Sequence, residues 1–192
     1  DESKIHGSIN IDEFFISDDL FSQTPLKGKF GKISGKVDFE SIRGNTKGNL
    51  SITNKLGLEM NGDIDVIKKD SNILLRSLNL YGEDSRLRVN GVWENSRRLN
   101  GYFYLDSLDL SRWLIEQEPT LLSGMAILEG TLDDNKALED IELTLEIAEY
   151  GVFADYESSF HGTVVYSDSI ISTVDPVMLV IGESILSIDG NT

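Results

Sequence analysis

The chain contains no cysteine, only three prolines and only two histidines among its 192 residues. Without cysteine it has no disulfide scaffold, no thiol nucleophile and no zinc–cysteine cluster. Its longest notable apolar run, residues 177–181, is far shorter than the ~20 residues of a membrane-spanning helix. The chain does not begin with methionine and shows no signal peptide, so we expect an excised or processed segment whose targeting parts are missing.

Basic residues are scarce, and nearly absent from one part of the chain. The 17 Lys and Arg face 33 Asp and Glu, and the net charge of −16 argues against a nucleic-acid partner. Residues 113–192 hold Lys136 as their single basic residue and sixteen acidic ones. This half is either a solvated face or a surface for a cation or a basic partner. Asp133, Asp134, Asn135, Glu139 and Asp140 lack the spacing of an EF-hand loop, so we predict no metal site.

Apolar residues recur at every second position in many short stretches, which is the period of a β-strand. Ile64-Asp65-Val66 and Leu87-Arg88-Val89 are examples. One apolar and one polar face per strand is typical of antiparallel sheets. Turn signals lie at Asn45, at residues 69–72, 94–96 and 133–135. We therefore predict an all-β protein of about sixteen short strands, at roughly 8–12 residues for each strand and turn.

Glycines repeatedly replace a residue of the apolar face without breaking the alternation. The positions concerned are Gly7, Gly35, Gly62, Gly91, Gly101, Gly124 and Gly162. A strand glycine marks a bend, a bulge or a close approach, and repeated on one face it lets a sheet curl strongly. The pattern favours an elongated, curled antiparallel sheet with an apolar inner groove over an ordinary β-sandwich.

Two segments have helical features. Residues 111–117 begin with a capping Ser111 and end before Pro119, which predicts one short helix that turns Trp113 and Leu114 onto the sheet. Residues 137–149 fit both periods, and we assign them to a strand because their neighbours are strands. The aromatic cluster at residues 102–104 is expected in the core.

No constellation of catalytic residues stands out. His6 and His161 both precede a patterned glycine on the polar face and lack a histidine or carboxylate at ligand spacing. The sequence contains no nucleophile elbow, no P-loop and no dinucleotide fingerprint. Acidic residues are abundant, but nothing singles out a pair for glycoside hydrolysis. We predict that the protein is not an enzyme and binds no cofactor.

Several stretches in order resemble a known family. Residues 105–114 are a strand running into Leu-Asp-Leu-Ser-Arg-Trp-Leu, and after Pro119 come the patterned residues 122–132, 141–145 and 148–151. Residues 80–91 and 184–190 form further units of glycine, small residue, strand and glycine. This order resembles the periplasmic repeats of AsmA/TamB-like proteins, best over residues 75–192. The acidity of the last 80 residues is not part of that pattern.

The resemblance implies a curled sheet called a β-taco in a protein that is anchored in the inner membrane and spans the periplasm. Such proteins are thought to carry phospholipid toward the outer membrane, and the TamB branch pairs with an Omp85-type outer-membrane protein. Residues 1–192 would then be one continuous segment of a longer, repeat-like β protein. Independently of the resemblance, an apolar trough would accept acyl chains, which gain ~0.8 kcal/mol per buried CH₂.

The shared phase of the strands predicts which residues line the groove. They are Ile9, Ile11, Val37, Phe39, Leu50, Ile52, Ile64, Val66, Leu87, Val89, Phe103, Leu105, Leu143, Leu145, Ile147, Val164 and Tyr166. The alternative is a non-catalytic periplasmic or extracellular β-sandwich that binds protein or glycan through an acidic, cation-dependent surface. Strand patterns at residues 5–11 and 185–190 also predict unpaired edges and edge-to-edge self-association.

Overall fold

A computed structural model describes residues 4–14, 32–95, 97–116, 119–132, 138–153, 156–167 and 170–190. Its strands are β1 (Lys4–Phe14), β2 (Ile33–Ile42), β3 (Asn45–Asn54), β4 (Glu59–Lys69), β5 (Asn72–Tyr81), β6 (Arg86–Glu94), β7 (Arg98–Leu108), β8 (Thr120–Leu132), β9 (Leu138–Phe153), β10 (Tyr156–Ser167), β11 (Ile170–Ile181) and β12 (Ser184–Ile188). All belong to one antiparallel sheet in which each strand pairs with its neighbours in chain order. The predicted all-β class is confirmed.

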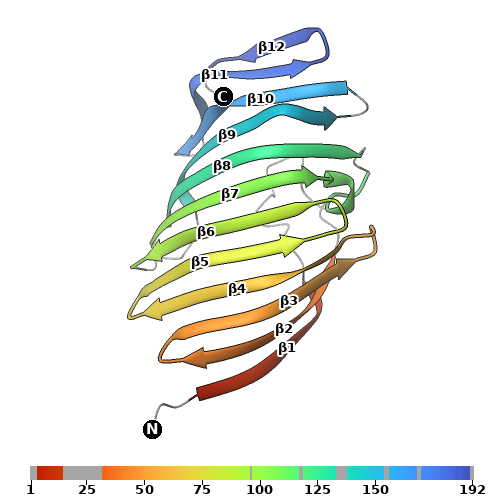
Figure 1. The fold of residues 1–192 in the computed structure, drawn as a ribbon. Helices are drawn as coiled ribbons and strands as arrows, with labels where there is room; N and C mark the ends of the chain where they lie inside the picture. The colour runs from red at the N-terminus through yellow and green to blue at the C-terminus, as the bar shows by residue number, and fades with distance from the viewer. Residues whose placement is uncertain are drawn as a thin grey trace.

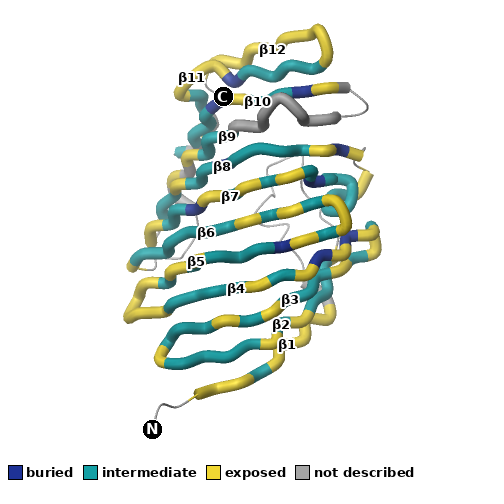
Figure 2. The backbone as a smooth tube through the Cα atoms, in the orientation of Figure 1, coloured by how far each residue is buried: buried dark blue, intermediate teal, exposed yellow. Residues whose placement is uncertain are grey.

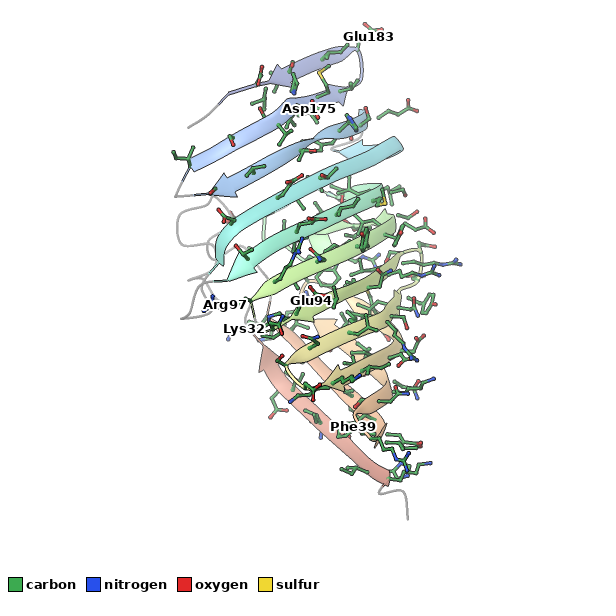
Figure 3. All side chains as sticks on the ribbon, turned by 90° about the vertical axis from the view of Figure 1, so that its left-hand side faces the viewer. Lys32, Phe39, Glu94, Arg97, Asp175 and Glu183 are labelled. Carbon is green, nitrogen blue, oxygen red and sulfur yellow. The ribbon has the colours of Figure 1, made fainter. Side chains whose placement is uncertain are left out.

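The sheet is curled and open. Its strands bow along their length and twist progressively from β1 to β12, and these two strands are its outer edges (Figures 1 and 3). The described strands therefore make a single layer, and not the two packed layers of a β-sandwich. None of the helices formed by the described residues has the length and apolar character needed to cross a membrane.

The prediction of about sixteen strands is wrong: the described residues form twelve, most of them 9–16 residues long. Hairpin turns are shorter than expected, so more residues remain in the ladder. Arg43 and Gly44 form one such turn with φ of 49° and 80°. Positive φ at both central residues matches the right-handed twist of the flanking strands. Asn45, predicted as a turn residue, instead opens β3.

The predicted helix at 111–117 is reduced to one 3-10 turn, η1 (Leu110–Arg112). The cap is Asp109 rather than Ser111, because its Oδ1 accepts from the backbone N of Ser111 at 3.0 Å and of Thr120 at 3.1 Å. One carboxylate thereby caps η1 and joins the end of β7 to the start of β8. The ambiguous residues 137–149 lie almost wholly in β9, paired with β8 and β10, as predicted.

The core is small and lies toward one end of the strands. Leu58, Met60 and Leu80 are nearly inaccessible and form one cluster, onto which Trp113 packs from the segment after η1. Figure 2 shows few buried positions, and intermediate exposure along most strands. Asn54 Nδ2 donates to the carbonyl of Arg112 at 2.7 Å, which ties this segment to β3 across the apolar face.

Candidate functional site

The strand register places the predicted groove residues on one face of the sheet. Directly opposed residues of an antiparallel pair project to the same side, so a face can be followed from strand to strand. One unbroken row crosses all twelve strands: Ile9, Val37, Leu50, Gly62, Leu80, Leu87, Leu105, Gly124, Ile147, Phe160, Leu179 and Leu186. Every position in it is apolar or glycine. We call this side of the sheet the apolar face.

A second row beside the first crosses ten strands. It contains Gly7, Phe39, Gly48, Ile64, Leu78, Val89, Phe103, Ala126, Leu145 and Gly162. Ile11, Ile52, Val66, Leu143 and Val164 lie in phase with these rows. The backbones of Ile147 and Tyr166 also lie in this phase, Ile147 opposite Phe160 and Tyr166 opposite Ile141. Their side chains lie outside the described part. That these residues meet lipid stays a prediction.

The apolar face is only partly covered. Val37, Phe39, Leu50, Ile64 and Val89 are all half-buried rather than buried. At the two outer edges exposure is larger: Ile9 is 51% exposed and Leu186 53% exposed. Partly exposed apolar side chains thus continue from strand to strand across the sheet, and a contiguous apolar surface of this kind is typical of interaction sites.

Glycines let the strands approach closely under this face. A Cβ on Gly62 would overlap the backbone oxygen of Asn79 in β5, and a Cβ on Gly91 would come within 2.4 Å of the backbone oxygen of Asn100 in β7. These glycines are therefore required by backbone proximity between neighbouring strands. The prediction that patterned glycines permit close approach is confirmed at these positions.

The opposite face is polar and linked by ion pairs across strands. Lys4 Nζ lies 2.8 Å from Glu40 Oε2, and Asp65 Oδ2 lies 3.6 Å from Lys47 Nζ and 3.7 Å from Arg76 Nη1. The hydrogen bond from Lys4 lowers the pKa of Glu40 below its ordinary value. A hollow of about 610 Å³ over β1–β5 is lined on this face largely by such paired side chains. Most charged side chains around this hollow are paired with each other, whereas Asp65 Oδ1 is buried and has no hydrogen-bond partner among the described residues.

Both histidines lie exposed on the polar face, as predicted. His6 Nδ1 is 3.8 Å from Glu40 Oε2, a contact that its sequence spacing did not show. Among the described residues, no group of three His, Cys, Asp or Glu could hold a metal ion. The acidic candidates Asp133, Asp134, Asn135 and the side chain of Glu139 lie outside the described part. Asp140 is described, and its carboxylate accepts hydrogen bonds from Ser167 and from Thr131.

The expectation that residues 102–104 form a core cluster is wrong for two of the three. Tyr102 and Tyr104 are 39% and 44% exposed on the polar face, and only Phe103 lies on the apolar face. Tyr104 lines a hollow of about 260 Å³ with Tyr81, Arg86, Arg88 and Asp106. The strand phase of Tyr102 and Tyr104, opposite to that of Phe103 and Leu105, was the signal in the sequence for this placement.

Comparison with known proteins adds no assignment. The chain matches no protein-family model, no curated protein and no solved structure.

Proposed function

We propose that this chain is a periplasmic segment of an AsmA/TamB-like envelope protein whose apolar face carries phospholipid acyl chains between the inner and outer membranes. In this role it would support outer-membrane biogenesis, with an Omp85-type outer-membrane protein as a partner of the full-length chain. The observation that carries the proposal is the row of apolar residues and glycines that runs from Ile9 to Leu186 without a polar interruption.

The length of this row favours a path over a pocket. Strands lie 4.7–4.9 Å apart, so twelve strands extend over roughly 50 Å. The hydrocarbon core of a whole bilayer is only about 30 Å thick, and one acyl chain spans about half of it. The row is therefore about three times as long as one acyl chain and can hold several chains in succession. Transport along the sheet requires such successive positions.

The partial exposure of the face favours an acyl ligand. Covering these partly exposed side chains removes apolar surface from water, which contributes about 25 cal/mol per Å². Such binding is non-directional and needs no catalytic group. The single-layer sheet gives less support to the alternative, a β-sandwich that recognises protein or glycan through its acidic half.

Photo-crosslinking tests the proposal through the alternation of faces. A photoreactive residue at Ile64, on the apolar face, is expected to trap phospholipid when the protein is incubated with vesicles. The same residue at the exposed neighbour Asp63, on the polar face, should not. Val89 and Asn90 in β6 provide a second matched pair. Circular dichroism of each variant first verifies that the sheet is intact.

Equal labelling at Ile64 and Asp63 would contradict the proposal, because these neighbouring positions lie on opposite faces of β4. Absence of labelling at Ile64 and Val89 in folded variants would also contradict it. Capture of calcium or of a glycan by the same preparations, without lipid, would favour the alternative.

A further inference from the structure

The hairpin turns form two lines along the apolar face, one at each end of the strands. We call these two lines its long edges, as distinct from the outer strands β1 and β12. Because consecutive strands are antiparallel, the β2–β3, β4–β5 and β6–β7 turns lie at one edge and the β3–β4, β5–β6 and β7–β8 connections at the other (Figure 1). Hydrogen bonds join the three turns of the first edge. Lys68 N donates to Gly44 O at 2.8 Å, and Asn95 N donates to Asn72 Oδ1 at 2.8 Å. The three turns therefore form one continuous structure.

This first edge is basic. Its turns and the strand ends beside them carry five basic side chains against two acidic ones, Asp70 and Glu94. The basic residues are Arg43, Lys68, Lys69, Arg97 and Arg98, and all five are exposed. Figure 3 looks onto this edge, where Arg97 and Glu94 are labelled. We call this structure the basic edge.

The opposite edge has the other sign. Its described connections, residues 55–58, 82–85 and 109–116, carry Lys55 and Arg112 against Glu83, Asp84, Asp109 and Glu116. The two edges of one apolar face therefore differ in charge, in a protein whose net charge is −16. A solvated surface has no need of such a separation, since either sign keeps a turn soluble.

The basic edge also adjoins the apolar face directly. Lys68 lies opposite Ile73, and Ile73 lies opposite Trp93, so this lysine continues the phase of Val66 at the end of β4. The indole N–H of Trp93 is buried and has no acceptor among the described residues. A buried donor without an acceptor is unfavourable, and an oxygen bound at this edge would supply an acceptor for the Trp93 indole.

We propose that the basic edge holds the phosphate groups of phospholipids whose acyl chains lie on the apolar face. The inference rests on the proposed function and adds to it the orientation of the lipid. Arg and Lys bind phosphate oxygens through charge-assisted hydrogen bonds, whereas the carboxylates of the opposite edge repel them. Each lipid is thereby held with its acyl chains on the apolar face and its headgroup at the basic edge.

Site-specific quenching tests this orientation, and the lack of cysteine makes single labels simple to introduce. Ser71→Cys places a fluorophore at the basic edge, and Ser85→Cys places one at the opposite edge, so the two labels flank β5. Phospholipid with a nitroxide on its headgroup should quench the Ser71 label more than the Ser85 label. Phospholipid with a nitroxide deep in its acyl chain should quench a label at Ile64→Cys.

Charge reversal separates orientation from binding. In the triple variant Lys68→Glu, Lys69→Glu, Arg98→Glu, the Ser71-to-Ser85 quenching ratio should fall to one while acyl quenching at Ile64 persists. Raising the salt should lower the ratio in the unmodified protein as well, because charges are screened over ~10 Å at 0.1 M.

Headgroup quenching that is equal at Ser71 and Ser85, with acyl quenching retained, would overturn this inference and leave the proposed function standing. A ratio that survives charge reversal would also overturn it. Absence of acyl quenching at Ile64 would overturn the proposed function and this inference together.

Discussion

The ring of Phe39 in β2 lies directly over Gly7 in β1, so close that a Cβ on Gly7 would come within 2.5 Å of Phe39 Cζ. Gly48 in β3 opposes Phe39 from the other side. The ring thus occupies the space above Gly7, and Gly48 lets β3 approach the Cα and Cβ of Phe39. Apolar residues and glycines oppose each other in this way along the apolar face, which allows the sheet to curl without collisions between side chains.

Alanine at Gly62 should destabilise the protein more than alanine at Gly7. The new Cβ at Gly62 meets the backbone of Asn79, which can move only if the β4–β5 ladder shifts. At Gly7 it meets the far end of the Phe39 ring, which can rotate away. Overpacking typically costs about 1–3 kcal/mol, and we expect Gly62→Ala at the upper end and Gly7→Ala below 1. Urea unfolding of both variants measures this, and equal losses would contradict the close approach at Gly62.

Removal of Trp113 should weaken the small core. Its side chain packs on Leu58, Met60 and Leu80, and truncation of a packed tryptophan costs about 3–5 kcal/mol. Because Trp113 is only partly buried, we expect about 3 kcal/mol for Trp113→Ala. Tyr102→Ala, which removes an exposed ring from the polar face, is the matched control. Calorimetry that finds no change in Tm for Trp113→Ala would mean that the segment after η1 does not close the core.

Asp109 should make the protein sensitive to acid. Burial raises the pKa of this carboxyl, but hydrogen bonds from Thr120 and Ser111 and the charge of Arg112 outweigh it, so the pKa is lowered. A lowered pKa in the folded state stabilises the protein above the unfolded pKa of about 3.9, and this stability is lost as the pH falls through the folded value.

Asp109→Asn should therefore flatten the loss of unfolding free energy below about pH 4. Asp109→Ala, which also removes the cap, should cost about 1 kcal/mol at neutral pH. Urea unfolding at a series of pH values provides the measurement. Asp70→Asn is the control, because Asp70 is an exposed carboxylate in the β4–β5 turn and asparagine also tolerates its positive φ. Identical acid profiles of Asp109→Asn and the unmodified protein would exclude the role of Asp109.

The outer strands should pair with other copies when salt is raised. β1 and β12 are the outermost strands of the described sheet, and Ile5, Ile185 and Ile188 are each more than half exposed. Unpaired N–H and C=O groups favour edge-to-edge association, which the net negative charge opposes until salt screens it. Sedimentation velocity across a salt series should show oligomers at high salt, and Ile185→Lys should shift their appearance to higher salt. A monomer at every salt and protein concentration would contradict the prediction.

Which residues share a face could be predicted from the alternation alone, because strand side chains alternate with a period of two whatever the strand pairs with. Ile64 and Val66 therefore lie on the apolar face as predicted, and Asp65 on the polar one. The turn at Asp70 could also be predicted, since a short polar residue tolerates its φ of 54°.

The identity of neighbouring strands, and the places where their ends meet, could not be predicted from the sequence and follow from the fold. Arg43, Lys68 and Arg97 are more than twenty residues apart in sequence, and antiparallel pairing in chain order brings them to one edge. The cap at Asp109 likewise depends on Thr120, which the return of β8 places beside it. Local alternation determines the face of a residue, whereas the position of a turn relative to other turns depends on long-range backbone hydrogen bonds that no short stretch of sequence contains.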